Sequence, residues 1–291
     1  MRKLSTEKRA MILHALVEGN SINATSRMCG CSKITVLRLL ADAGTFCAEY
    51  HNDHARNLQC ERVQMDEIWS FVGCKDKAIK AGAVGHGSVW TWVAIDADTK
   101  MVVSYLMGER DADTAQAFVS DLRDRIDSRI QLTSDGFRAY LNAVSQAFGG
   151  YVDYAMLIKE YGWDGSPDTR YSQPACVGTI KHAICGMPDK DHVSTSLVER
   201  QNLTLRMGSR RFTRLTNAFS KKVENHAHAI ALHYFYYNFC RKHQTIKTTP
   251  AVAMGVADRQ MTILDLVNLI EAEEARLGRR ITDYLPAADS K

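Results

Sequence analysis

The sequence has no apolar run that approaches the ~18 residues typical of a membrane-spanning helix. Its first residues, Met1 to Glu7, also lack the apolar segment and cleavage site of a secretory signal peptide. Hydrophobic residues make up 45% of the chain and charged residues 24%, a composition typical of globular proteins and not of disordered ones. These features predict a cytoplasmic protein with no membrane partner.

Metal-binding patterns of cysteine and histidine are also missing. None of the eight cysteines forms a C-x-x-C pair, and Cys29-Gly30-Cys31 is too tight for an ordinary zinc half-site. We therefore expect reduced and mostly structural thiols. Four histidines in the C-terminal third contain no pair spaced by four residues, which favours core or DNA-contact roles over zinc binding: His226, His228, His233 and His243.

The net charge of +4 is modest, but the basic residues are clustered. Residues 1 to 40 contain seven lysines and arginines against two glutamates. Residues 200 to 222 contain another seven and no acid. Such clusters are typical of nucleic-acid binding, and the alternative is a solvated helix face.

The N-terminal basic cluster falls on a helical pattern. A helix is predicted from Leu4 to Val17, a short one after Ser21, and a third from Lys33 to Leu40, with Gly30 in the turn before it. This order predicts an all-α helix-turn-helix domain over residues 1–44, although small helical bundles share the pattern. Its third helix would place Lys33, Thr35 and Arg38 in the DNA major groove. Residues 45–62 are predicted as a linker with room for a short helix.

The central part of the chain alternates strand and helix patterns. Three strands are predicted at 63–74, 89–95 and 100–107, followed by a helix at 113–126, a strand at 130–133, a helix at 137–148 and a strand at 151–158. A helical crossover makes the fourth strand parallel in the same sheet. This order predicts an α/β fold with a ribonuclease-H-like mixed sheet flanked by helices.

We place this catalytic domain at residues 63–245. Residues 160–195 are predicted to be an irregular insertion near the site, because they are too long for a passive loop. Residues 246–291 form a predicted C-terminal tail with an amphipathic helix. The aromatic helix at 223–239 and this tail helix are the candidate subunit interfaces.

Three carboxylates stand out against this topology. Asp66 lies on the first strand, Asp135 at the end of the fourth and Glu199 near the start of a basic helix. A carboxylate on a buried strand is costly unless it is paired or binds a metal. Neighbouring strands lie ~4.8 Å apart, so Asp66 and Asp135 can reach the same metal pair. We therefore predict that Asp66, Asp135 and Glu199 are catalytic residues that ligate metal.

Each carboxylate also has a local explanation. Asp135 precedes Gly136 and fits a turn, and Glu199 fits a capping box with Ser196. Glu67 should face away from Asp66 because strand residues alternate, so it is not expected to be a direct ligand. Two further carboxylates are predicted to belong to a hairpin turn, Asp96 and Asp98.

Carboxylate oxygens suit magnesium, and two ions ~3.5–4 Å apart can activate an attacking oxygen and stabilise a leaving one. We expect two Mg²⁺ ions, with Mn²⁺ as a substitute. The second basic cluster would hold DNA phosphates near them, through residues that we predict to bind DNA: Arg206, Arg210, Arg211, Arg214, Lys221 and Lys222. Water as the attacker gives strand nicking, and a DNA 3′-hydroxyl gives strand joining.

Several motifs, in order, closely resemble the bacterial insertion-sequence-one (IS-one) family of DDE transposases. They are Met65-Asp66-Glu67-Ile68-Trp69, Thr133-Ser134-Asp135-Gly136, Val198-Glu199-Arg200-Gln201-Asn202, the basic stretch 211–222 and Tyr237-Asn238-Phe239-Cys240-Arg241. The resemblance covers about residues 5 to 257. It implies a magnesium-dependent transposase in which Asp66, Asp135 and Glu199 form the catalytic triad and Arg206 the basic position that follows it. The best-known members carry an N-terminal zinc finger, which the cysteines of this chain do not form.

The predicted function is therefore DNA transposition: binding the terminal repeats of an insertion sequence and carrying out Mg-dependent cleavage and strand transfer into target DNA. Joining two ends in one event predicts a homo-oligomer, at least a dimer on DNA. Because its substrate would be bacterial DNA, we expect the protein to be cytoplasmic and associated with the nucleoid. Two alternatives are a DNA-binding regulator with an inactive ribonuclease-H-like core and a nuclease without joining activity.

Overall fold

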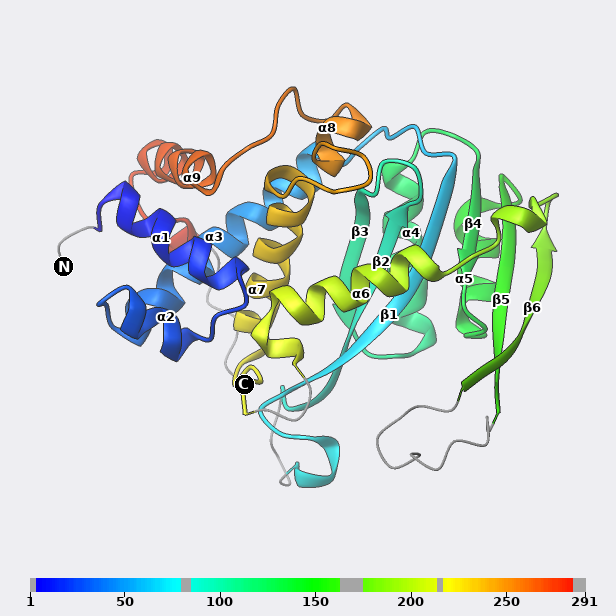
Figure 1. Ribbon diagram of the computed structural model, residues 1–291, viewed down its shortest axis with the longest axis horizontal. Coiled ribbons are helices and arrows are strands. Elements are labelled where there is room, and N and C mark those ends of the chain that lie inside the picture. The colour runs from blue at the N-terminus through cyan, green and yellow to red at the C-terminus, as the bar shows by residue number, and fades with distance from the viewer. Residues whose placement is uncertain (1–3, 80–84, 163–174, 214–216, 285–291) are drawn as a thin grey trace. The chain divides into compact units, whose positions relative to one another are not determined.

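A computed structural model describes residues 4–79, 85–162, 175–213 and 217–284 (Figure 1). Contacts divide the chain into two units, and we describe each by itself. The first comprises Met1–Arg56, Trp69–Trp90 and Asn202–Lys291. The second comprises Asn57–Ile68 and Thr91–Gln201. Among the described residues, no helix is both long and apolar enough to cross a membrane.

A mixed six-stranded sheet organises the second unit, and two of its strands continue into the first. Its order is β3-β2-β1-β4-β5-β6. β1 pairs in parallel with β4, β4 in parallel with β5, and β5 antiparallel with β6. The strands are β1 (Arg62–Val72), β2 (Gly87–Asp96), β3 (Val102–Gly108), β4 (Ile130–Ser134), β5 (Val152–Gly162) and β6 (Ala175–Cys185).

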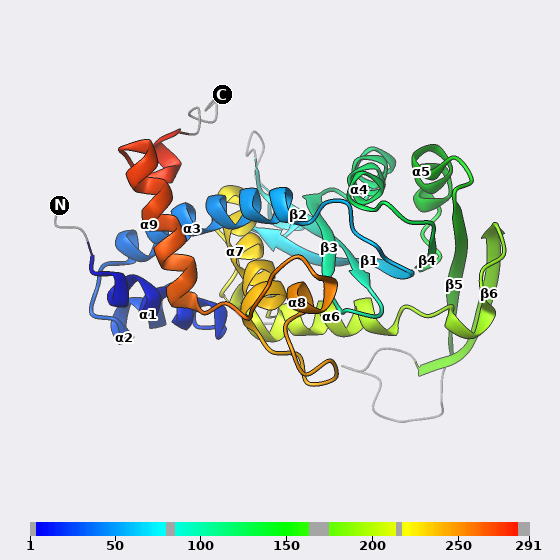
Figure 2. The same ribbon diagram turned by 90° about the horizontal axis from the view of Figure 1, so that it is seen from above.

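Helices cover both faces of this sheet in the second unit. α4 (Ala112–Arg125) and α5 (Ala139–Phe148) lie on one face, and α6 (Ser196–Gly208) begins on the other (Figure 2). The buried ring of Trp92 lies between the sheet and these helices, with ring-centroid distances of 5.8 Å to Phe118 and 5.5 Å to Tyr140. This aromatic packing fixes α5 against the sheet close to the carboxylates.

The strand order confirms the predicted mixed sheet and the parallel neighbours β1 and β4. One prediction was wrong: residues 160–195 are not irregular throughout, because β5 extends to Gly162 and β6 pairs with it. Exposed side chains such as Val177 and Ile184 give β6 no alternating pattern, since its backbone hydrogen bonds to β5 define it. Residues 163–174 lie outside the described part of the chain.

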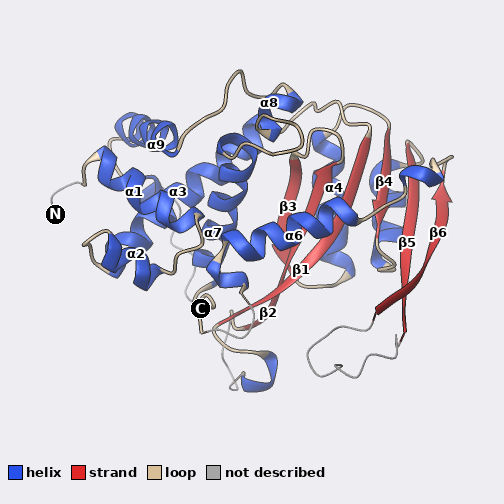
Figure 3. Ribbon diagram, viewed as in Figure 1, coloured by secondary structure: helices blue, strands red, loops and turns tan. Residues whose placement is uncertain are grey.

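The first unit is mostly helical (Figure 3). Serine side chains cap its first three helices, because the hydroxyls of Ser5, Ser21 and Ser32 each accept a backbone N–H of the first turn. The helices are α1 (Thr6–Val17), α2 (Ile22–Met28), α3 (Lys33–His54), α7 (Val223–Phe235) with a π-helical turn (Tyr236–Cys240), α8 (Pro250–Met254) and α9 (Ile263–Leu277). Short 3₁₀ turns in the two units are Asp76–Ala78, Lys190–His192, Arg210–Phe212 and Ile281–Tyr284.

Helix α3 is longer than the sequence predicts. Residues 45–54 were expected to begin a linker, but they continue the helix to His54. The polar residue Asp42 lies 3% exposed in its middle because its carboxylate accepts hydrogen bonds from Arg280, at 2.7 Å, and from the Thr282 hydroxyl, also at 2.7 Å. These partners are far away in the sequence, so periodicity alone does not reveal them.

Helix α7 packs along α3 in the core of the first unit. A Cβ at Gly44 would collide with His228, so the glycine permits this close approach. Tyr50 of α3 meets Phe235 edge-on at 5.3 Å and Phe239 at 5.2 Å. The expectation that residues 223–239 form a subunit interface was therefore wrong for most of their aromatic side chains, because they are buried within this unit.

The acidic face of α9 is also engaged within the first unit. The buried guanidinium of Arg9 on α1 donates to Glu271 at 3.0 Å and to Glu274 at 2.7 Å. A buried charge of this kind needs such partners to offset its desolvation. The C-terminal helix is thus held against the N-terminal one.

Candidate active site

Three carboxylates meet at one end of the β1–β4 pair in the second unit. Asp66 and Glu67 are consecutive residues of β1, and Asp135 follows the last residue of β4. One ligand atom from each of the three lies within 4.8 Å of the other two. The backbone N–H of Phe137 donates to Asp135 Oδ1 at 2.9 Å and orients that carboxylate. The predicted proximity of Asp66 and Asp135 is confirmed.

Ionisation of these neighbouring carboxylates is unfavourable, because they are partly buried and carry like charges. Burial, and then repulsion from Glu67 and Asp135, raises the pKa of Asp66 to about 7. Burial and the Asp135 charge also raise the pKa of Glu67, although hydrogen bonds from Arg110 and Tyr140 oppose the shift. The end of the sheet therefore concentrates negative charge that a cation would relieve.

Arg110 is the cation that the chain itself supplies. Its Nε donates to Glu67 Oε1 at 2.5 Å, and its Nη2 lies 3.8 Å from Asp135 Oδ2. The guanidinium carbon lies 4.1 Å above the Phe137 ring, a cation–π contact. The indole of Trp92 donates to the Glu109 carbonyl at 3.1 Å and so fixes the loop that carries Arg110.

Glu199 lies in the first turn of α6 but outside this three-carboxylate group. Its Oε2 accepts from Lys159 Nζ on β5 at 2.5 Å, and its Oε1 accepts from the Thr195 hydroxyl at 2.5 Å. Partial burial lowers the pKa of Lys159, but the hydrogen bond and the charge of Glu199 outweigh it, so the pKa of Lys159 is raised overall. Glu199 is nevertheless near enough to contribute to the raised pKa of Asp66.

The start of α6 is anchored to β1 from the same face as Asp66. The side-chain carbonyl of Gln64 accepts from the backbone N–H groups of Leu197 at 2.9 Å and Val198 at 3.2 Å. Gln64 and Asp66 are two residues apart on one strand and so share a face. The predicted capping box with Ser196 is not the contact that forms, because the helix begins at Ser196 and Glu199 reaches back to Thr195.

Two site residues were missed from the sequence. Glu67 was expected to face away from the metals, and its carboxylate does bond Tyr140 on the α5 side at 2.9 Å. Its long side chain nevertheless brings a carboxylate oxygen within 4.8 Å of ligand atoms of Asp66 and Asp135. Arg110 lies in a loop, and no sequence pattern marks it. The turn role expected for Asp96 is confirmed, because its Oδ2 accepts from the Thr99 N–H and hydroxyl, both at 2.7 Å.

The donor set suits a hard divalent cation. All three clustered side chains offer carboxylate oxygens, the ligands that Mg²⁺ and Mn²⁺ prefer. Burial first, and then the charges of neighbouring carboxylates, raise the pKa values of Asp66 and Glu67, so a bound cation would stabilise their ionised forms. Residues that could hold an ion are Asp66 and Asp135, with Glu67 or Glu199 as a third donor.

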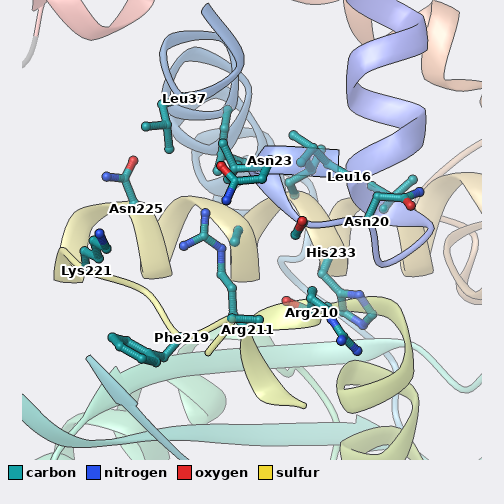
Figure 4. A pocket seen from close by; sticks show the side chains of 18 of the residues that line it. Leu16, Asn20, Asn23, Leu37, Arg210, Arg211, Phe219, Lys221, Asn225 and His233 are labelled. Carbon is teal, nitrogen blue, oxygen red and sulfur yellow. The ribbon is translucent and has the colours of Figure 1, made fainter. Parts of the chain in front are cut away.

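The expected DNA-binding residues that the structure describes lie in the first unit. Lys33 and Arg38 are exposed on α3, while the Thr35 hydroxyl lies 2.9 Å from that of the capping Ser32. Arg206 is half-buried in the last turn of α6, and Arg210, Lys221 and Lys222 are exposed. Arg214 lies outside the described residues. Lys33, Arg210, Arg211 and Lys221 line one cavity, so the two basic clusters of the sequence meet there (Figure 4).

Residues 58–149 match the family model described as IS1 transposase. The segment runs from the residues before β1 to the end of α5, so it contains Asp66, Glu67, Arg110 and Asp135 but not Glu199. Over these residues the chain is similar to IS1 transposases. This match agrees with the resemblance of the sequence motifs around Asp66 and Asp135.

Among solved structures, the chain is similar to the Mos1 transposase paired-end complex with left transposon end, at 13% identity, a TM-score of 0.24 and coverage of 53% of this chain and 60% of that one. It is also similar to the Mos1 strand transfer complex, at 10% identity, a TM-score of 0.24 and coverage of 81% and 76%. Scores this low bear on neither the fold nor the function. No curated protein matches the chain.

Proposed function

We propose that this protein is a transposase of the IS1 family, which binds the ends of an insertion sequence and carries out Mg²⁺-dependent DNA cleavage and strand transfer with Asp66, Asp135 and Glu199. The observation that carries the proposal is the meeting of Asp66 and Asp135 on adjacent parallel strands, with the pKa of Asp66 raised to about 7. A strained cluster of carboxylates is typical of a catalytic metal site. A DNA-binding regulator with an inactive core would have no use for such a cluster of carboxylates.

Each side chain has a distinct part in the proposal. Asp66 and Asp135 would hold the metal from the two strands, and Glu199 would be the third ligand, from α6, in place of its ion pair with Lys159. Glu67 positions Arg110 through its 2.5 Å hydrogen bond, and Tyr140 fixes the other oxygen of Glu67. Two bound divalent ions would activate an attacking oxygen and stabilise the leaving one. Mn²⁺ would replace Mg²⁺.

DNA binding is assigned to the first unit. The helix-turn-helix formed by α2 and α3 reads the terminal repeats through Lys33 and Arg38, with Thr35 at the helix start. Arg206, Arg210, Arg211, Arg214, Lys221 and Lys222 hold DNA phosphates. Because two ends are joined in one event, the active species is at least a dimer on DNA.

A strand-transfer assay on DNA carrying the element ends, with Mg²⁺, tests this proposal. Asp66→Asn, Asp135→Asn and Glu199→Gln should each lower cleavage and joining more than about a hundredfold while end binding persists. Arg38→Ala should do the reverse, losing end binding but acting on pre-cut DNA at high concentration. Full activity in Asp66→Asn would overturn the metal-site assignment. Cleavage without any joining would instead indicate a nuclease.

Glu67→Gln separates the two candidates for the third ligand. If Glu199 is the ligand, Glu67→Gln should retain most cleavage, and Glu199→Gln should retain almost none. The opposite result would assign the third position to Glu67.

A further inference from the structure

A cavity of about 360 Å³ lies within the first unit, where α2 and α3 meet residues 208–211 and 217–221 and α7 (Figure 4). Its volume falls in the ~300–1,000 Å³ range of small-ligand sites. Its walls combine cationic, amide, hydroxyl and apolar side chains with one imidazole. Among the described residues, no aspartate or glutamate lines it.

The positive charges on one side of the cavity have no acidic side chain beside them among the described lining residues. Arg211 points into it and donates to the Ser220 hydroxyl, a neutral partner, at 2.7 Å. Burial lowers the pKa of Arg211 to about 10, and no acidic side chain contributes a shift in the other direction. Lys33, Arg210 and Lys221 add three further positive charges to the same lining. A phosphate group is the anion that suits such a set of donors.

His233 lines the same cavity and is only 4% exposed. Within the part of the chain that the structure describes, neither of its ring nitrogens has a hydrogen-bond partner. A buried polar group without a partner costs about 1–3 kcal/mol, so a structure rarely keeps one without a reason. Burial lowers the pKa of His233 to about 3, so the ring is neutral and offers one donor and one acceptor.

The chain leaves room for this ring. A Cβ at Gly208 would lie 2.9 Å from His233 Cε1, so only glycine fits there without a shift of the imidazole. The other walls are apolar, with Leu16, Leu37 and Phe219 among them, and carry amides such as Asn23 and Asn225. A bare inorganic anion needs no apolar wall, whereas a nucleobase uses both apolar surface and amide hydrogen bonds.

We propose that this cavity binds one nucleotide, with its phosphate at Arg211, Lys33 and Lys221 and its base beside His233. The nucleotide has two sources with the same chemistry, a free mononucleotide or an unpaired nucleotide of a DNA strand. The second source rests on the proposed transposase function, and the first does not.

Calorimetric titration of the full chain in EDTA, without DNA, tests the site separately from catalysis. We expect dAMP to bind and inorganic phosphate to bind at least about tenfold more weakly. Lys33→Gln and Lys221→Gln should each weaken dAMP binding about tenfold, as expected for a lost charge-assisted hydrogen bond. The matched variant Lys242→Gln removes an exposed charge that does not line the cavity and should leave binding unchanged.

His233→Phe tests the base side of the cavity. It should bring dAMP affinity down towards that of phosphate while phosphate binding stays the same. A general loss of packing would weaken both ligands together. Arg211→Gln serves as a further test where its circular dichroism matches that of the parent chain, and the two exposed lysines keep the proposal testable where it does not.

Duplex DNA with one unpaired terminal nucleotide, compared with blunt duplex, identifies the source. Preferential binding of the unpaired end that dAMP competes away supports a strand nucleotide. Binding of dAMP without competition supports a free nucleotide. The proposal is overturned if phosphate binds as tightly as dAMP, or if neither dAMP nor the unpaired end shows any dependence on Lys33 and Lys221.

Discussion

Lys159 Nζ lies 2.5 Å from Oε2 of Glu199, so an ion pair joins β5 to the first turn of α6 beside the carboxylate cluster. Both oxygens of Glu199 are engaged in this arrangement, because the Thr195 hydroxyl bonds the other at 2.5 Å. For Glu199 to act as the metal ligand that we propose, it has to exchange Lys159 for the cation. Under that proposal, Lys159 would compete with the metal for the same carboxylate.

Replacing Lys159 with methionine should tighten Mn²⁺ binding, measured by electron paramagnetic resonance. The pair is partly exposed, so the gain should be about two- to fivefold. The same substitution in a Glu199→Gln background should give almost no gain, because the competing contact is already lost. An equal gain in both backgrounds would show that Lys159 acts only through its general positive charge.

Metal should stabilise the folded chain through Asp66. At Mg²⁺ concentrations of about ten times Kd, linkage gives about 1.4 kcal/mol, or about 3 °C in the unfolding midpoint. Asp66→Asn should abolish this shift. Differential scanning calorimetry of both proteins, with and without Mg²⁺, measures the shift in the unfolding midpoint. An undiminished shift in Asp66→Asn would show that the ion binds elsewhere.

The same carboxyl gives a pH dependence without metal. Its pKa is raised from 3.8 to about 7 in the folded state, so folding favours its protonated form. That stability is present below pH 4 and is lost as the pH rises through 7. In EDTA, wild type should lose stability between pH 4 and 8 relative to Asp66→Asn. Parallel pH profiles would contradict the raised pKa.

The meeting of Asp66 with Asp135 could be predicted because it depends on topology. A helical crossover after a three-stranded meander places the fourth strand beside the first, and Gly136 marks where that strand ends. Because side chains alternate along a strand, the sequence correctly predicts that Glu67 points away from Asp66 towards α5. The alternation does not predict that the Glu67 carboxylate also approaches Asp135, or that the loop residue Arg110 binds it.

Features that depend on distant partners could not be predicted. The second half of α3 looks like a linker until Phe235 and Phe239, more than 180 positions later, pack against its Tyr50. Strand β6 has no apolar alternation, since nearly all of its described side chains are exposed and its backbone pairs with β5. In both cases the tertiary contact, and not the local pattern, determines the structure.

Arg110 should matter for stability as well as for the site. Glu67 has a side chain only 1% exposed, and Arg110→Met would leave its charge without a cation. We expect a loss of about 2 kcal/mol in urea denaturation, since Arg110 itself is partly exposed. Glu67→Gln in the same chain should restore most of it. Arg138→Met, which removes an exposed arginine, is the matched control and should cost almost nothing.

The core of the first unit should be sensitive to acid because of His226. This residue is fully buried, and its ring nitrogens lie 3.0 Å from the Ser70 hydroxyl and 2.9 Å from that of Ser220. Burial lowers the pKa of His226 to about 3, so the folded state keeps it neutral while the unfolded chain protonates it near 6.5. Its contribution is therefore full above pH 6.5 and is lost as the pH falls towards 3.

Between pH 7 and 5 this single residue should remove about 2 kcal/mol from the free energy of unfolding. His226→Gln should be less stable at pH 7 but should lose less stability on acidification. Urea denaturation at several pH values measures the difference in slope. His192→Gln changes an exposed histidine and should keep the wild-type slope. If His226→Gln and wild type lost stability in parallel, the buried ring would have to be protonated in the folded state as readily as in the unfolded one.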